Sequence, residues 1–191
     1  MTSSFYDENA EAYASRVRGL PMARLDAFLA GLKPAARVLE LGCGGGQDSA
    51  YMLKKGFDVV PSDGSASLAR EAEKLIGRPV KVMQFQELDA ADEFDGIWAE
   101  ASLLHVPRAQ LPDVFSRIRI ALRKDAPVHA SFKAGDAEGH DGLGRYYNYP
   151  PAVSLFELLA ISGLKDITID EADGTGYDNM PTRWLYIAAG K

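Results

Sequence analysis

The stretch RVLELGCGGGQDSAYMLKKGFDVVPSD, residues 37–63, decides the fold of this chain. It opens with an apolar run, places four glycines among the five positions 42–46, continues with a segment of helical period and ends in a second apolar run. Near-continuous apolar runs are typical of strands covered on both faces, as in a parallel sheet. The stretch therefore predicts a strand, a sharp glycine turn, a helix and a second parallel strand.

The same alternation of strand-like and helical segments continues along the chain. It predicts an α/β fold with a doubly wound, Rossmann-like sheet. Two final strand-like runs follow the last helix with only a loop between them, which predicts a hairpin and hence one antiparallel strand in a mostly parallel, seven-stranded sheet. The expected strands are residues 37–41, 57–61, 80–85, 94–99, 127–133, 164–170 and 183–190, and the expected helices are 47–56, 65–77, 107–122 and 152–163.

The segment before the first strand predicts an N-terminal helical cap, residues 1–34, on a core formed by residues 35–191. Its apolar residues fall on one helical stripe, formed by Leu20, Leu25, Phe28, Leu29 and Leu32. A chain of 191 residues with 47% hydrophobic and 25% charged residues is expected to form a single domain.

Composition also narrows the class of partner. No run approaches the roughly 20 apolar residues of a membrane span, and the N-terminus lacks the features of a signal peptide, so we expect a cytoplasmic protein with no membrane contact. One cysteine and three scattered histidines give no metal site. A net charge of −6 without a basic run disfavours nucleic acid. We expect a monomer or weak dimer that binds a small molecule.

The glycine turn is the predicted ligand site, because ligands of doubly wound sheets bind at the carboxyl ends of the strands. Its spacing is G-x-G-x-G, and Gln47 stands where a dinucleotide fingerprint has its third glycine. A P-loop is excluded because no G-K-[ST] follows, and Asp48 at the helix start disfavours a polyphosphate. A glycine turn that binds no ligand is the other interpretation.

Three motifs carry a resemblance to a known family: VLELGCGGGQD, the acid that ends VVPSD, and EFDGIWAEASLLHV. With the FYDENAEAYA opening and the terminal hairpin, nearly the whole chain resembles the class I S-adenosylmethionine-dependent methyltransferases. The ASLLHVPR stretch is similar to the small tellurite-resistance-type and type 11 or 12 methyltransferases. The resemblance implies an enzyme that uses S-adenosyl-L-methionine to methylate a small soluble acceptor.

The resemblance also implies roles for particular residues. Asp63, 17 residues beyond Gly46, would hold both ribose hydroxyls, although a helix N-cap or turn role is equally consistent with SDGS. Glu40 would lie near the methionine moiety, and residues 86–88 would contact adenine. The full set of expected cofactor contacts is Tyr13, Glu40, Gly42, Cys43, Gly44, Asp63, Gly64, Ser65, Glu87, Leu88, Ala101 and Leu103.

His105 follows the fourth predicted strand and is the candidate general base, with a packed histidine as the alternative. Two irregular segments, residues 5–17 and 135–150, are expected to close over the cofactor. Their candidate acceptor contacts are Tyr6, Arg145, Tyr146 and Tyr147, although these tyrosines would also serve to pin a loop to the core.

Two other functions fit parts of the sequence. A module that binds S-adenosylmethionine without catalysis would have the same motifs, since this chemistry has no obligatory catalytic residue. A nicotinamide-dependent oxidoreductase would share the fold but is disfavoured by Gln47.

Overall fold

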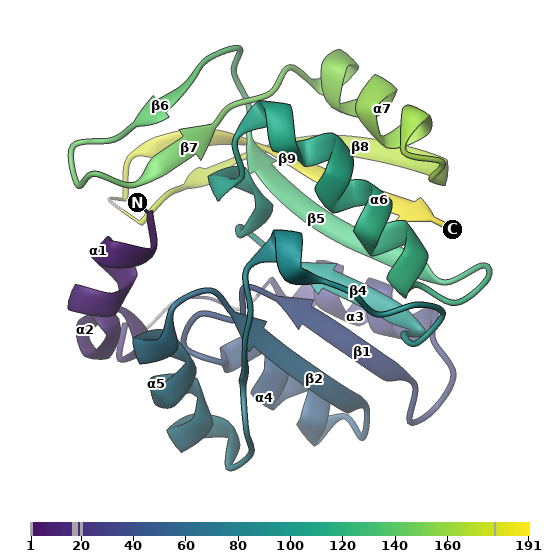
Figure 1. Cartoon of the computed structure of the whole chain (residues 1–191), viewed down its shortest axis with the longest axis horizontal. Helices are drawn as coiled ribbons and strands as arrows, with labels where there is room; N and C mark the ends of the chain where they lie inside the picture. Colours follow the sequence, from purple (N-terminus) through teal and green to yellow (C-terminus); the bar gives the residue numbers. More distant parts are fainter. Residues whose placement is uncertain (1, 17–18, 20, 178) are drawn as a thin grey trace.

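The computed structural model describes residues 2–16, 19, 21–177 and 179–191, with side chains from residue 5 onward. Leu20 of the predicted apolar stripe and the last residue of the segment 5–17 lie outside these residues. One seven-stranded sheet runs through the molecule in the order β3-β2-β1-β4-β5-β9-β8 (Figure 1). The strands are β1 (Arg37–Leu41), β2 (Asp58–Asp63), β3 (Lys81–Val82), β4 (Gly96–Ala99), β5 (Pro127–Lys133), β8 (Lys165–Thr175) and β9 (Pro181–Gly190).

The strand directions confirm the predicted sheet. β1, β2, β3, β4 and β5 are mutually parallel, whereas β9 pairs antiparallel with both β5 and β8. The order reverses at β1, from which the chain steps outward first to β2 and β3 and then, through β4, to the other side. The carboxyl ends of β1 and β4 therefore border the switch point where such sheets bind ligands.

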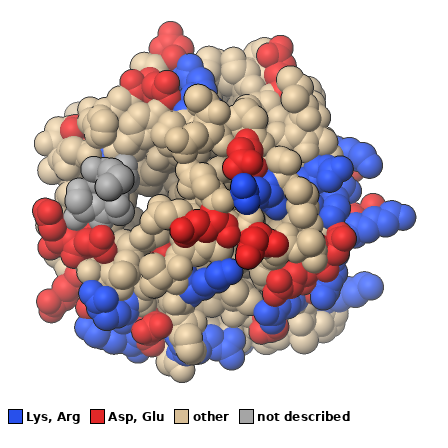
Figure 2. All heavy atoms as spheres, in the orientation of Figure 1, with Lys and Arg blue, Asp and Glu red and all other residues tan. Residues whose placement is uncertain are grey.

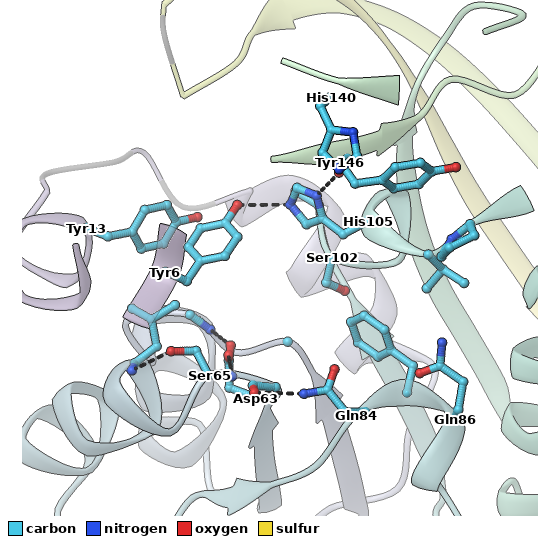
Figure 3. A pocket seen from close by; sticks show the side chains of 18 residues that line it. Tyr6, Tyr13, Asp63, Ser65, Gln84, Gln86, Ser102, His105, His140 and Tyr146 are labelled. Atoms are coloured by element: carbon cyan, nitrogen blue, oxygen red, sulfur yellow. Dashed lines mark hydrogen bonds between the residues drawn. The ribbon is translucent and has the colours of Figure 1, made fainter. Parts of the chain in front are cut away.

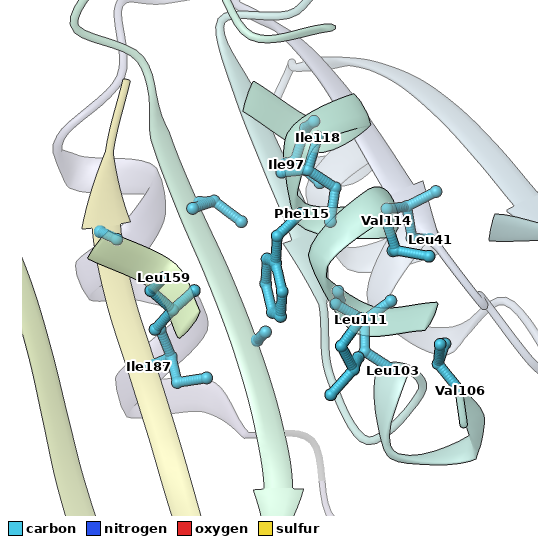
Figure 4. Packing of buried hydrophobic residues seen from close by; sticks show 14 of the residues in the cluster. Leu41, Ile97, Leu103, Val106, Leu111, Val114, Phe115, Ile118, Leu159 and Ile187 are labelled. Carbon is cyan, nitrogen blue, oxygen red and sulfur yellow. The ribbon is translucent and has the colours of Figure 1, made fainter. Parts of the chain in front are cut away.

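Helices cover both faces of the sheet. α6 (Leu111–Ala121) and α7 (Ala152–Ile161) cover one face, and α3 (Met22–Ala30) and α4 (Gln47–Lys54) pack on the other. The side chains of α6 that face the sheet are fully buried around Phe115 (Figure 4). Burying a large apolar side chain contributes roughly 1.5 to 3 kcal/mol, so this face fixes α6 against β4 and β5.

The predicted third strand, residues 80–85, is much shorter in the structure. Only Lys81 and Val82 pair with β2, and both are exposed at the edge of the sheet. The chain then turns into a 3-10 helix, η1 (Phe85–Glu87), where the Gln84 N–H donates to the Glu87 carboxylate at 2.7 Å in a capping box. Capping of this kind favours a helical turn over further strand pairing.

Residues 135–150, expected to be irregular, contain a small hairpin. Its strands are β6 (Glu138–His140) and β7 (Tyr146–Asn148). The Asp141 carboxylate closes the turn by accepting the backbone N–H groups of Leu143 and Arg145 at 3.0 and 2.9 Å. Side-chain bonds of this kind form turns that hydrophobic periodicity does not reveal.

The N-terminal residues form two short helices, α1 (Thr2–Glu8) and α2 (Ala10–Ala14), which lie beside α5 (Ala66–Ile76) at the carboxyl edge of the sheet (Figure 1). α3, by contrast, packs in the core beneath Trp98. On the face shown in Figure 2, acidic and basic side chains are interspersed. No helix within the described ranges has both the length and the apolar character of a membrane span.

Candidate active site

The backbone of the glycine turn is closely approached by two neighbouring segments. Gly42 has φ +76°, and a Cβ there would lie 2.5 Å from the Cβ of Ser102. A Cβ at Gly45 would lie 3.0 Å from the Cα of Ala14, at the end of α2. Bare backbone is therefore needed for a left-handed turn and for close approach of the loop after β4 and of the N-terminal helices.

Two cavities open around this turn. Cavity A, about 370 Å³, is lined by Asp63, Gly64, Ser65 and Leu68, by residues 84–86 and by Ser102. Figure 3 shows Gln84 beside Asp63 at the base of this cavity, with Ser102 above them. None of the described residues that line cavity A is a lysine or an arginine. The Oγ of Ser102 is buried, with no hydrogen-bond partner among the described residues. Cavity A therefore offers a carboxylate, amides, an unused hydroxyl and apolar walls, which suits an uncharged nucleoside and not a polyphosphate.

Asp63 is the one carboxylate among the described residues lining cavity A, at the end of β2. Its two oxygens accept the backbone N–H groups of Gly44 at 2.9 Å and Ser65 at 2.8 Å. Burial raises the pKa of Asp63 to about 6 in spite of these two bonds. The carboxylate is thus held rigidly beside the glycine turn, and its remaining lone pairs are available to hydroxyl donors.

Cavity B, about 470 Å³, lies on the other side of the turn. Its lining brings together aromatic rings from the N-terminal helices, β7 and β9 with side chains of both charges. Six residues also line cavity A, so the two cavities adjoin there: Tyr6, Tyr13, Gly42, Gly44, Ala101 and His105. Ala101 has φ +51°, a strained conformation for alanine of the kind found at functional sites.

His105 and Tyr6 form a hydrogen-bonded pair where the cavities adjoin (Figure 3). The His105 Nδ1 lies 2.6 Å from the carbonyl oxygen of Tyr146, which can only accept, so Nδ1 carries the hydrogen. Nε2 is then the acceptor for the Tyr6 hydroxyl at 2.9 Å. Burial lowers the pKa of His105 to about 4 and raises that of Tyr6. At neutral pH the pair is therefore an uncharged imidazole accepting from an uncharged phenol.

Most of the predicted site residues lie at these two cavities. Four line cavity A alone: Asp63, Gly64, Ser65 and Tyr146. Four line cavity B alone: Glu40, Cys43, Arg145 and Tyr147. The other six line both cavities: Tyr6, Tyr13, Gly42, Gly44, Ala101 and His105. The Cys43 side chain packs among Ala69, Ala72 and Val80, and burial raises its pKa, so only its backbone is suited to a ligand.

Three predicted contacts lie elsewhere. Glu87 caps η1 through the Gln84 N–H, and Leu88 and Leu103 are buried in the main core. Residues 84–86 and Ser102 occupy the corresponding places on the cavity wall. For the segment after β3, the reason is the early end of that strand, which shifts the cavity-facing residues from the predicted 86–88 to 84–86.

Sequence reasoning also missed residues contributed by distant elements. Arg24 of α3, Glu100 after β4, Lys133 at the end of β5 and the β9 rings of Trp184 and Tyr186 all line cavity B. Glu100 and Lys133 could have been found from the sequence, because each is a charged residue at the end of a parallel strand. The carboxyl ends of parallel strands meet at the edge of the sheet where ligands bind. The contribution of β9 depends on its pairing with β5, which periodicity alone does not specify.

The arrangement has counterparts among known proteins. A family model described as methyltransferase domain matches residues 13–166. The fold is similar to that of Burkholderia thailandensis 1,6-didemethyltoxoflavin-N1-methyltransferase, solved with 1,6-didemethyltoxoflavin and S-adenosylhomocysteine, with a TM-score of 0.74 and 23% identity over 99% of this chain and 86% of that one. Among curated proteins, none matches the sequence.

Two further structures share the fold. A Methanosarcina mazei S-adenosylmethionine-dependent methyltransferase gives a TM-score of 0.78 at 17% identity, over 92% of this chain and 99% of that one. Haemonchus contortus phosphoethanolamine N-methyltransferase 2, in complex with S-adenosyl-L-methionine, gives 0.78 at 15% identity, over 100% of this chain and 60% of that one. Since the family model covers most of the sequence, the chain belongs to the methyltransferase domain family and is a class I methyltransferase whose cofactor is S-adenosyl-L-methionine.

Proposed function

We propose that this methyltransferase acts on a small soluble acceptor bound in cavity B, while cavity A holds the adenosine part of the cofactor. The observation that carries the proposal is the shared lining of the two cavities, where Ala101 and His105 face both. A methyl donor and its acceptor must meet in line, and proximity of this kind contributes roughly 7 to 11 kcal/mol. The shared lining is the place where two adjoining ligands would meet.

The residues of cavity A fit each part of adenosine. Asp63 would accept hydrogen bonds from the ribose hydroxyls, residues 84–86 would flank the adenine, and the Ser102 Oγ would gain the partner that it lacks. Glu40 and the backbone of 42–44 would face the methionine end from cavity B. When bound, S-adenosylmethionine supplies a methyl group on a cationic sulfur that an acceptor nucleophile displaces, leaving a neutral thioether.

Tyr6 and His105 would orient the acceptor and take up a proton where the acceptor must lose one. The Tyr6 oxygen retains lone pairs toward the cavities while its hydrogen points to His105 Nε2. An acceptor proton passing to Tyr6 would therefore be matched by transfer of the Tyr6 proton to His105, and the tautomer held by the Tyr146 carbonyl leaves Nε2 ready to receive it.

The test combines binding with turnover. Calorimetry is expected to show binding of S-adenosylmethionine and S-adenosylhomocysteine but not of NAD or ATP. Methyl-labelled cofactor is then offered with a panel of small acceptors, and transfer of label to a member of the panel is the expected result. Tight NAD binding would return the chain to the oxidoreductase alternative. Cofactor binding without transfer to any acceptor would favour a binding module.

A further inference from the structure

We propose that the acceptor is a small organic anion and that Arg24 binds its anionic group. The inference rests on the proposed function, in which cavity B holds the acceptor. It concerns the charge class of the substrate, which neither the fold nor the Tyr6–His105 pair determines.

The charged side chains of cavity B are divided by element. Its four described cations come from the N-terminal segment, α3, β5 and the hairpin loop, and they are Arg16, Arg24, Lys133 and Arg145. Its described carboxylates come from β1, α4 and the loop after β4, and they are Glu40, Asp48 and Glu100. Glu40 and Asp48 flank the glycine turn in the sequence, where the cationic sulfonium end of the cofactor would lie, and Glu100 lies in the loop after β4.

The carboxylates already have partners. Glu40 accepts the Ser49 hydroxyl, Asp48 accepts the Trp98 indole N–H at 2.9 Å, and Glu100 lies 2.7 Å from the His129 Nε2. Among the cations, Arg145 is paired with Asp141, which lies on its own hairpin. The ion pair with Asp141 leaves Arg145 less available to an anionic ligand.

Arg24 differs from these groups. Its guanidinium stacks 3.6 Å from the ring centroid of Tyr186, its Nε is buried without a hydrogen-bond partner among the described residues, and no described carboxylate lies within ion-pair distance of it. A buried donor left unsatisfied is destabilising, and an anionic ligand would supply the missing hydrogen-bond acceptor. Stacking holds the planar group in one orientation, which suits recognition of a carboxylate or phosphate.

The position of Arg24 connects it to the reacting centre. Tyr186 beneath it pairs with Ser131 of β5, and the Ser131 Oγ accepts the backbone N–H of Ala101 at 2.7 Å. Ala101 belongs to the lining shared by both cavities. An acceptor whose anionic group lies at Arg24 would thus extend along the face of β5 and β9 toward the shared lining.

The experiment measures binding in the presence of saturating S-adenosylhomocysteine, by ligand-detected NMR and calorimetry. The probes are small carboxylates, organic phosphates and acidic phenols, each paired with a neutral analogue of similar shape, such as 4-hydroxybenzoate with 4-hydroxybenzamide. The variants are Arg24→Gln, which removes the charge, and Arg24→Lys, which keeps it. Arg78→Gln is the matched control, because Arg78 is an exposed arginine that precedes β3 at the opposite edge of the sheet.

We expect wild type to bind anions of at least one class at least tenfold more tightly than their neutral partners. Arg24→Gln should abolish that preference, while Arg24→Lys and Arg78→Gln should retain it. The class that binds identifies the anionic group. Equal binding of neutral analogues, failure of every anion to bind, or an unchanged preference in Arg24→Gln would overturn the inference. Calorimetry with S-adenosylhomocysteine alone keeps the two proposals apart, since loss of that binding would count against the proposed function itself.

Discussion

Asp63 is the side chain that most directly connects the sequence motif to the cofactor. It is only 8% exposed, and its carboxylate is held by two backbone N–H groups beside cavity A. Asp63→Ala should weaken binding of S-adenosylhomocysteine by about 1.5 to 3 kcal/mol, the scale for losing a hydrogen-bond partner that carries charge. Calorimetry measures this directly. An unchanged affinity would leave Asp63 with a role in the turn alone.

The pKa values of His105 and Asp63 predict opposing effects of acid on stability. His105 has its folded pKa lowered to about 4 from 6.5, so its contribution to stability is full above pH 6.5 and is lost as the pH falls toward 4. Asp63 has its folded pKa raised to about 6 from 3.8, so between these values the folded state gains stability as the pH falls. Each effect spans two to three pH units, or about 3 kcal/mol at 1.36 kcal/mol per unit.

The two contributions should nearly cancel in the wild type between pH 6.5 and 4. His105→Asn should therefore gain stability on acidification relative to wild type, and Asp63→Asn should lose it. Urea unfolding at a series of pH values measures both differences. Parallel pH profiles for wild type and His105→Asn would show that the imidazole titrates normally.

The sequence motifs correctly predicted cavity residues whose role depends on a glycine backbone or on a position near the end of a strand. Gly42, Asp63 and His105 each follow a strand end, and all three face a cavity in the structure. Glu87, Leu88 and Leu103 line neither cavity, because a shift of one or two residues in a short 3-10 turn exchanges a cavity wall for the core. Arg24 was missed because its importance arises from Tyr186, 162 positions later.

At the scale of elements, α1 is tied to the helix that borders cavity A. The Asp7 carboxylate accepts the Ser65 hydroxyl at 2.5 Å and the Ser67 N–H at 3.2 Å, at the N-terminus of α5. The Ser65 hydroxyl bond is the main reason that the pKa of Asp7 is lowered. A carboxylate at a helix N-terminus contributes typically 0.3 to 1 kcal/mol, enough to shift a short helix between docked and undocked states.

Asp7→Ala should therefore loosen α1 and α2 without unfolding the sheet. Hydrogen exchange should be faster in residues 5–14 of the variant, dissociation of S-adenosylhomocysteine should be several-fold faster, and Tm should remain near that of wild type. Glu8→Ala is the control, since Glu8 is exposed on the same helix. Wild-type protection in Asp7→Ala would mean that packing alone holds these helices.

The β6–β7 hairpin depends on Arg145, which the sequence placed among the acceptor contacts. Its side chain is 2% exposed, and it donates to Asp141 at 2.6 and 2.9 Å. Arg145→Ala should cost about 3 to 5 kcal/mol of stability, because it leaves the partly buried Asp141 carboxylate unpaired. Chemical denaturation measures the loss, and Asp141→Asn together with Arg145→Ala should recover part of it. Undiminished stability would assign Arg145 to the acceptor alone.

Helices and strands were predicted correctly where a long segment has a regular apolar pattern. The prediction failed where side-chain hydrogen bonds determine the local structure. Six of the seven predicted strands and the helices α4 to α7 lie where apolar patterns predicted them. β3 is an exception, because an exposed edge strand gains little from burial and the Gln84–Glu87 cap ends it. The β6–β7 hairpin was not predicted because its turn is formed by hydrogen bonds to the Asp141 carboxylate, which leave no apolar pattern in the sequence.

At the scale of the whole molecule, the doubly wound, mostly parallel sheet followed from the alternation of strand-like and helical segments, whereas the order of its strands was not predicted. One antiparallel strand followed from the absence of a helix between the last two strands, and the structure shows that this strand is β9. Residues 5–17 were expected to close over the cofactor, but the way in which α1 and α2 dock did not follow from the sequence. α1 and α2 are short and partly exposed, and their place depends on contacts such as that of the Gln47 amide with the Ala14 carbonyl, at 3.1 Å.

Those helices give the molecule a kinetic property. Tyr6 and Tyr13 line both cavities, so one pair of short helices borders the proposed cofactor and acceptor sites at the same time. Movement of these helices would then govern departure of both products, and the slow step of turnover would be a displacement of protein through solvent. We expect kcat to fall in proportion as sucrose raises the viscosity, and Asp7→Ala to reduce that dependence. A kcat that is indifferent to viscosity would assign the slow step to methyl transfer.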